Sequence, residues 1–268
     1  MKNVLSIAGS DSCGGAGIQA DLRTFSALGT YGMTAITAIT AQNTTGVFKV
    51  HELDGDMVRA QINCLFEDIE ISAVKIGMVS SIEVIETIAD CLLENRATNI
   101  VLDPVMVSKS GYHLLRPESK EALIRTLFPV ADIVTPNLFE AEAITGKKIR
   151  TIDEMKKAAV EIYQLGVRNV AVKGGHLSGE PIDVVFDGKE FELLEGKRIP
   201  TSNTHGTGCS FSSAIAAYMA RGFTAREAAR KAKQYLRIAI ENSIKLGHGA
   251  GPIHHFYDLY HRAGIDEQ

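Results

Sequence analysis

The chain has 268 residues, 45% of them hydrophobic and 22% charged, a globular composition with ample apolar material for one large core. Its 28 basic and 32 acidic residues give a net charge of −4 without any basic cluster, which argues against a nucleic-acid partner. The four cysteines lack paired or zinc-ligand spacing, and neither a leader nor an apolar run of about 18 residues is present. We therefore expect a soluble cytoplasmic protein without a membrane partner, folded as a single domain over residues 1–268.

The first part of the chain alternates short apolar runs with stretches of helical periodicity. Residues 4–8 have the continuous apolar pattern of a strand that is buried on both faces. A glycine-rich loop over residues 9–17 follows, and apolar residues at helical spacing over residues 18–28 predict a helix that ends at Gly29. Residues 34–41 predict the next strand, so the chain opens as a strand, loop and helix that lead into a second strand.

The same alternation continues along the rest of the chain and predicts an α/β fold with a mostly parallel sheet. An Asp-Gly pair at residues 187–188 predicts a hairpin turn, so we expect an antiparallel edge on that sheet. Further strands are predicted at residues 47–53, 74–78, 100–103, 133–135, 170–173 and 184–191, and further helices at residues 57–66, 82–92, 114–128 with Pro117 near its start, 155–165, 225–245 and 253–261.

Two features of the first loop and helix remain open in the sequence. Residues 15–20 match the dinucleotide fingerprint GxGxxA between a strand and a helix, but residues 34–45 lack the acidic residue that such a site requires. Asp21 falls inside the apolar sector of the helix, near Ile18 and Phe25. A carboxylate in that sector requires either polar partners or a cleft.

Polar or adaptable side chains follow several predicted strands, at the sheet edge where parallel sheets bind ligands. Gln42 carries an acceptor and a donor suited to a heteroaromatic ring, although a solvated loop glutamine is the simpler interpretation. Met78 is suited to packing on such a ring, but methionine in this position is more often part of the core. Asp103 closes a strand before Pro104, where it either binds a cation near a phosphate or caps the next turn.

A second group of candidates follows the strands of the C-terminal half. Asn137 and Glu140 have the Asn-x-x-Glu spacing of a helix capping box, and their oxygens also suit hydrated magnesium. The sequence does not separate these two roles. Lys173, at the end of its strand, is a candidate to contact a polyphosphate.

Residues 204–213 (THGTGCSFSS) combine glycines with the predicted start of a helix. The first amides of a helix lack intrahelical acceptors, so Gly206 and Gly208 indicate a phosphate-binding site at this helix start. Cys209 lies in the same field, and we expect a lowered thiol pKa there. The alternatives are a plain glycine-rich helix start with a buried cysteine, and a covalent nucleophile of a cysteine amidohydrolase with His205 as its partner.

Five motifs, in this order and without a large insertion, carry a specific resemblance. They are residues 9–21 (GSDSCGGAGIQAD), 103–106 (DPVM), 135–140 (TPNLFE), 173–176 (KGGH) and 205–209 (HGTGC). From residue 4 to about residue 256 the chain resembles the hydroxymethylpyrimidine/phosphomethylpyrimidine kinases of thiamine biosynthesis. It differs at Cys13, where the family usually has serine. The P-loop motif GxxxxGK[ST] does not occur, so a P-loop kinase is excluded.

The resemblance implies a ribokinase-like three-layer α/β/α sandwich. It also implies transfer of the terminal phosphate of ATP, with Mg²⁺, to 4-amino-5-hydroxymethyl-2-methylpyrimidine and then to its monophosphate. By position it implies that the substrate is bound by Gly9, Asp21, Gln42, Met78 and Val105. It implies that the nucleotide phosphates and magnesium are bound by Asp103, Asn137, Glu140 and Lys173, with Asp103 and Glu140 toward the metal. It also implies an anion hole formed by Gly206, Thr207 and Gly208, and a general base at Cys209.

Alternatives remain at the level of substrate and assembly. Pyridoxal or pyridoxine kinase is the runner-up, because relatives of this branch phosphorylate a ring of similar size, and a non-catalytic nucleotide sensor is a third possibility. A homodimer is a family expectation that no residue pattern demonstrates. The position of residues 44–53 directly after Gln42 makes that segment a candidate lid over the substrate.

Overall fold

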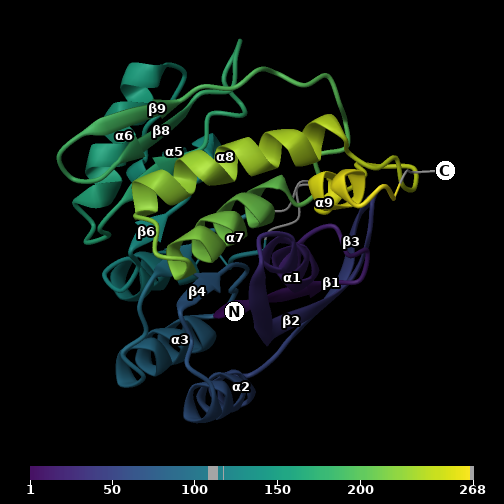
Figure 1. The fold of residues 1–268 in the computed structure, drawn as a ribbon. Coiled ribbons are helices and arrows are strands. Elements are labelled where there is room, and N and C mark those ends of the chain that lie inside the picture. The colour runs from purple at the N-terminus through teal and green to yellow at the C-terminus, as the bar shows by residue number, and fades with distance from the viewer. Residues whose placement is uncertain (108–113, 117, 266–268) are drawn as a thin grey trace.

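The alternation of apolar runs and helices produces one mixed sheet between two helical layers (Figure 1). The structure, a computed structural model, describes residues 1–107, 114–116 and 118–265. Within this part of the chain the strands are β1 (Lys2–Asp11), β2 (Thr30–Asn43), β3 (Gly46–Glu52), β4 (Ala73–Ile76), β5 (Ile100–Leu102), β6 (Ile133–Val134), β7 (Val170–Val172), β8 (Asp183–Phe186) and β9 (Phe191–Leu194). Their order in the sheet is β3-β2-β1-β4-β5-β6-β7-β8-β9.

The inner strands, in the order β2, β1, β4, β5, β6 and β7, run parallel to one another, and antiparallel strands close both edges of the sheet. β3 pairs with β2 at one edge, and the β8–β9 hairpin follows β7 at the other. The predicted α/β fold with a mostly parallel sheet is therefore confirmed, and the hairpin around residues 187–188 is present as expected. The chain returns to opposite sides of β1 to form β2 and β4, so the strand order reverses there and opens a crevice at the carboxyl ends of the strands.

Helices cover both faces of the sheet (Figure 1). They are α1 (Gly17–Ala27), α2 (Gly55–Asp68), α3 (Ile82–Glu94), α4 (Ser119–Ala122), the π-helical turn η1 (Leu123–Leu127), α5 (Leu138–Thr145), α6 (Ile152–Tyr163), α7 (Thr207–Ala220), α8 (Ala225–Glu241) and α9 (Tyr257–Arg262). Successive strand residues face opposite layers: Val4 belongs to the core cluster that includes residues of α1, α7 and α8, whereas Leu5 belongs to the cluster that includes residues of α2, α3 and α6. This alternation explains why the buried strands read as continuous apolar runs.

Two predicted helices begin later than their patterns indicated. Helix was expected over residues 253–261, but α9 begins at Tyr257. Helix was also expected over residues 114–128, but α4 begins at Ser119. The amides of Leu114 and Leu115 both donate to the carbonyl of Met106, at 2.9 and 3.1 Å, which ties these residues back to the segment after β5. Pro117, expected near the helix start, lies outside the described residues. Over the described ranges, none of the helices is long and apolar enough to cross a membrane.

Candidate active site

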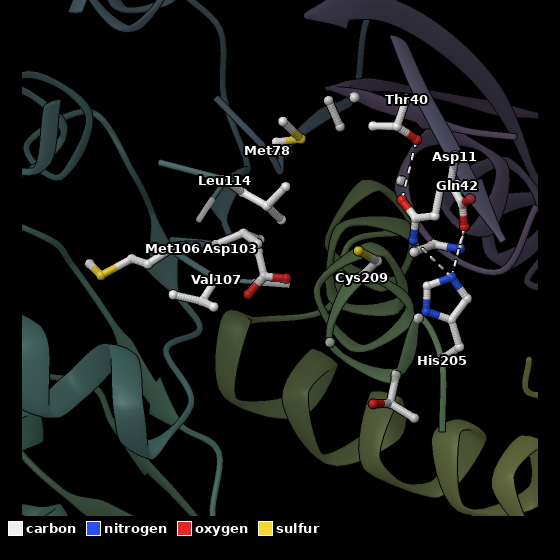
Figure 2. Close-up of a pocket in the computed structure, with 18 of the residues that line it drawn as sticks. Asp11, Thr40, Gln42, Met78, Asp103, Met106, Val107, Leu114, His205 and Cys209 are labelled. Carbon is white, nitrogen blue, oxygen red and sulfur yellow. Dashed lines mark hydrogen bonds and ion pairs between the residues drawn. The ribbon is translucent and has the colours of Figure 1, made fainter. Parts of the chain in front are cut away.

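The carboxyl ends of the strands open into a cavity of about 1250 Å³. Its wall is built by the ends of β1, β2, β4, β5 and β7 and by the start of α7, elements that are distant in sequence (Figure 2). The cavity wall includes Gly9, Gln42, Met78, Asp103, Val105, Asn137, Glu140, Lys173, Gly206, Thr207, Gly208 and Cys209. The structure thus brings together every site residue that the sequence suggested except Asp21.

Glycine is required at the start of α7. Gly206 is the N-cap residue with φ of 79°, and a Cβ atom there would lie 1.7 Å from the carbonyl oxygen of Gly15. A Cβ atom on Gly208 would meet the Nζ of Lys173 at 3.4 Å and the Oδ2 of Asp103 at 3.6 Å. The open amide end of the helix therefore lies beside a charged pair, which is an arrangement suited to an anion.

Asp103 and Lys173 form that pair at the ends of β5 and β7. Lys173 Nζ donates to Asp103 Oδ1 at 2.8 Å, and the hydroxyl of Thr135 donates to the same oxygen at 3.1 Å. Burial by itself would lower the pKa of Lys173, but Asp103 and Glu140 outweigh burial and raise it. Lys173 is therefore a cation that faces the cavity at neutral pH.

The Asn137–Glu140 capping box is present. The Asn137 side chain accepts from the amide of Glu140 at 2.9 Å, and Glu140 Oε2 accepts from the amide of Asn137 at 2.7 Å. Burial and the charge of Asp103 raise the pKa of Glu140 to about 7, against the attraction of Lys173. Glu140 therefore caps α5 and also places in the cavity wall a carboxyl group whose negative charge is only partly compensated.

Cys209 occupies its predicted place in the first turn of α7, but the expected low pKa is wrong. Burial, followed by the charges of Asp21 and Asp103, raises the pKa of the thiol to about 11. Lys75 and the Gly17 backbone oppose this rise and do not outweigh it. The positive end of the helix stabilises a thiolate only within the first turn, and here this stabilisation is smaller than the cost of removing water from the charged sulfur.

Asp21 is the predicted substrate residue that does not line the cavity. Both its oxygens pair with the Nζ of Lys75, at 3.0 and 2.9 Å, and the hydroxyls of Ser6 and Ser213 donate to them at 2.6 Å. Asp21 and Lys75 are both fully buried, so the carboxylate in the apolar sector has partners instead of a cleft.

The sequence indicated no role for Asp11, and it suggested His205 only as the partner of Cys209 in the amidohydrolase alternative. Asp11 accepts from the amides of Cys13, Gly15 and Ala16 at 2.8 to 3.1 Å, and its Oδ2 lies 2.8 Å from His205 Nε2 (Figure 2). A dinucleotide pyrophosphate would need these loop amides, so the fingerprint at residues 15–20 serves an internal carboxylate. The signal was an acid inside the glycine-rich loop and a histidine directly before Gly206.

Solved structures of kinases share this fold. The ADP complex of Bacillus subtilis pyridoxal kinase superposes with a TM-score of 0.89 and 42% identity, covering 95% of this chain and 97% of that one. Phosphomethylpyrimidine kinase from Clostridium difficile gives a TM-score of 0.79 and 52% identity, covering 88% of this chain and 98% of that one. The fold and the crevice therefore define a small-molecule kinase of the ribokinase-like class.

Sequence relatives narrow this class. A family model described as phosphomethylpyrimidine kinase matches residues 11–254. A hydroxymethylpyrimidine/phosphomethylpyrimidine kinase of Rhizobium meliloti is 52% identical over 94% of this chain and 96% of its own length. The chain is 48% identical to the thiamine biosynthesis bifunctional protein ThiED of Geobacter sulfurreducens, but spans only 52% of that protein. The chain belongs to the phosphomethylpyrimidine kinase family.

Proposed function

We propose that this chain, as one kinase domain over residues 1–268, uses ATP to phosphorylate 4-amino-5-hydroxymethyl-2-methylpyrimidine and then its monophosphate, for thiamine biosynthesis. The observation that carries the proposal is the meeting of a glycine-opened helix start with the Asp103–Lys173 pair in one cavity, in a chain of this family. The cavity of about 1250 Å³ has room for both a nucleotide and a small ring.

The start of α7 supplies the main stabilisation of the transferring phosphoryl group. The amides of Gly206 and Gly208 have no intrahelical acceptors, and the amide of Thr207 donates only to the Thr204 carbonyl at 3.4 Å, so all three are held in place before the reaction. Lys173 adds a full positive charge beside Gly208. Phosphoryl transfer depends on such positioning and charge neutralisation more than on covalent chemistry by the protein.

Asp103 and Glu140 are the residues that would hold Mg²⁺, and Asn137 lies beside them at the α5 start. Over the described residues no cluster of three or more His, Cys, Asp or Glu side chains suited to a metal occurs. Two carboxyl groups nevertheless fit an ion that keeps several waters, and a bound cation would offset the burial that raises the pKa of Glu140. When bound, Mg²⁺ would neutralise charge on the nucleotide phosphates.

The pyrimidine ring would bind between Gln42 and the Gly9, Met78 and Val105 side of the cavity. A Cβ atom on Gly9 would lie 3.0 Å from the sulfur of Met78, so a larger residue there would push the Met78 side chain. Gln42 offers the polar contact, and Met78 and Val105 offer apolar contacts. Asp21 is not proposed to contact the ring, since its side chain is fully buried against Lys75.

Cys209 remains the proposed proton acceptor for the alcohol, as a weak base. Its pKa of about 11 keeps the free thiol protonated at neutral pH, so proton transfer must come late. A loose transition state tolerates late deprotonation of the nucleophile. The second acceptor is already a phosphate and needs little help from a base.

Pyridoxal phosphorylation is the second candidate function, favoured by the high structural similarity to Bacillus subtilis pyridoxal kinase. Steady-state rates on the two rings separate the candidates. The main proposal is tested by ADP release with the hydroxymethylpyrimidine, with and without Mg²⁺. We expect release that depends on both the ring and the metal, and absence of ring-dependent release would overturn the proposal.

We also propose a cytoplasmic homodimer that uses the β2–β3 edge. Ile39 and Phe48 expose 50% and 68% of their surface on these two strands, and apolar side chains of this size favour a protein partner. Residues 44–53, the candidate lid, mostly form β3, whose pairing with β2 limits independent motion. Sedimentation of the wild type and of Phe48→Glu tests the dimer, and an unchanged monomeric mass in both would contradict it.

A further inference from the structure

The Asp11–His205 pair joins the two glycine loops that flank the cavity. His205 Nε2 lies 2.8 Å from Asp11 Oδ2, and both side chains are largely buried (Figure 2). The imidazole packs directly on the first loop, since a Cβ atom on Gly15 would lie 2.2 Å from His205 Cδ2. Gly206, the next residue, contacts the same loop through the carbonyl of Gly15. The ring of His205 is therefore fixed on the side of the anion hole.

The partners of Asp11 determine where the imidazole carries its proton. Burial would raise the pKa of Asp11, but the hydrogen bonds from His205 and from the Ala16 and Cys13 amides lower it instead. An ionised carboxylate only accepts hydrogen bonds. His205 Nε2 must therefore carry hydrogen and donate it to Asp11.

This proton constrains the side-chain amide of Gln42. Gln42 Nε2 lies 3.3 Å from His205 Nε2, so two donors face each other. On the other side of the amide, the Thr40 hydroxyl lies 3.2 Å from Gln42 Oε1 and 2.9 Å from the Ser10 carbonyl, with one hydrogen for two acceptors. A 180° turn of the amide removes both conflicts. Its oxygen then shares, at 3.3 Å, the Nε2 hydrogen that His205 donates mainly to Asp11 at 2.8 Å, and its nitrogen donates to the Thr40 hydroxyl, whose hydrogen remains with the Ser10 carbonyl.

We propose that His205, held by Asp11, is a positioning residue that locks the Gln42 amide with its oxygen toward the imidazole. Gln42 then presents its second N–H and its second lone pair to the ring in one fixed order. The inference rests on the proposed function in taking the ring as the substrate. It makes His205 a determinant of ring specificity, because a ring edge with donor and acceptor in the opposite order leaves buried polar groups unpaired.

The kinetic test compares His205→Leu, which removes the donor, with His205→Gln, which keeps an N–H donor on a flexible chain. Loss of an oriented hydrogen bond of this kind is worth about ten- to hundredfold. We expect His205→Leu to raise KM for the pyrimidine by about that factor with a smaller change in KM for ATP, and His205→Gln to restore part of the loss. In a Gln42→Leu background the same His205→Leu change should cost less than about threefold.

Additive losses in the double variant, or equal changes in the KM values of ATP and the ring, would overturn the proposal. A second readout does not depend on catalysis: long-range ¹H–¹⁵N spectra of the wild type with labelled histidine. Hydrogen on His205 Nε2 supports the inference, and a bare Nε2 refutes it even if the enzyme is active. If the wild type releases no ADP with the pyrimidine, the proposed function fails while the spectra still decide the position of the proton. If His205→Leu does not fold, His205→Gln and the spectra decide.

Discussion

Two aspartate–lysine pairs lie near the start of α7, and they have opposite uses. Asp21 and Lys75 pair at 2.9 Å with both side chains fully buried, and two serine hydroxyls donate hydrogen bonds to the Asp21 carboxylate. Asp103 and Lys173 pair at 2.8 Å, with 15% of the lysine side chain exposed to the cavity. The chemistry of the two pairs is the same, so accessibility decides which one can exchange its partner for a ligand.

The buried pair is a structural element because its groups satisfy one another. Burial favours neutral Lys75, but Asp21 outweighs burial and raises the pKa of the lysine. The open pair instead keeps a cation and a carboxylate beside the helix amides, where phosphate oxygens can compete for Lys173.

The largest effect is expected from Lys75→Met. The substitution leaves Asp21 charged, buried and unpaired, which costs about 3–5 kcal/mol of unfolding free energy. Urea denaturation measures the loss. The double variant Lys75→Met/Asp21→Asn removes both charges and should recover part of it. A single variant as stable as the wild type would show that the pair contributes nothing.

Lys173→Met, the matched change in the open pair, is expected to act on catalysis. Removal of one preorganised charge from a phosphoryl-transfer site costs about 10²–10³-fold in kcat, or about 2.7–4 kcal/mol. Stability should change less than in Lys75→Met, because Asp103 keeps the Thr135 hydroxyl and faces the cavity. Single-turnover rates and urea melts are compared on the same preparations. A large stability loss with normal turnover would reverse the assignment of the two pairs.

Glu140 is expected to make stability depend on pH. Its pKa rises from 4.5 to about 7 on folding, so the folded chain binds more protons than the unfolded chain between these values. The free energy of unfolding should therefore fall as pH rises from about 4.5 to 7, by roughly 3 kcal/mol from this group. Glu140→Gln should flatten that slope. Parallel slopes for the two proteins would mean that the carboxyl group is not perturbed.

The smallest effect is expected at Cys209. Because proton transfer is late, Cys209→Ala should slow phosphorylation of the alcohol by about tenfold and that of the monophosphate less. Separate rates with each purified acceptor test this difference, and equal losses would remove the proposed role. Iodoacetamide labelling of the wild type should accelerate with pH up to about 11, which checks the raised pKa directly.

The fold and the location of the site were predictable because they follow from local patterns. Apolar runs and helix periodicity identified strands and helices, and parallel strands place their carboxyl ends at one edge. Gln42, Asp103 and Lys173 therefore gather in one cavity, as their positions after strands indicated. The Asn137–Glu140 capping box was also predictable, since its two hydrogen bonds span only three residues.

By itself, the sequence determined the element order, the helix start at Gly206 and the family of the chain. Only the tertiary structure decided which charges are partners: Asp21 meets Lys75 across 54 residues, and His205 meets Asp11 across 194. The same packing removed water from Cys209 and reversed the expected direction of its pKa shift. Hydrogen bonding within a helix turn depends on neighbours in the chain, whereas desolvation and ion pairing depend on neighbours in space.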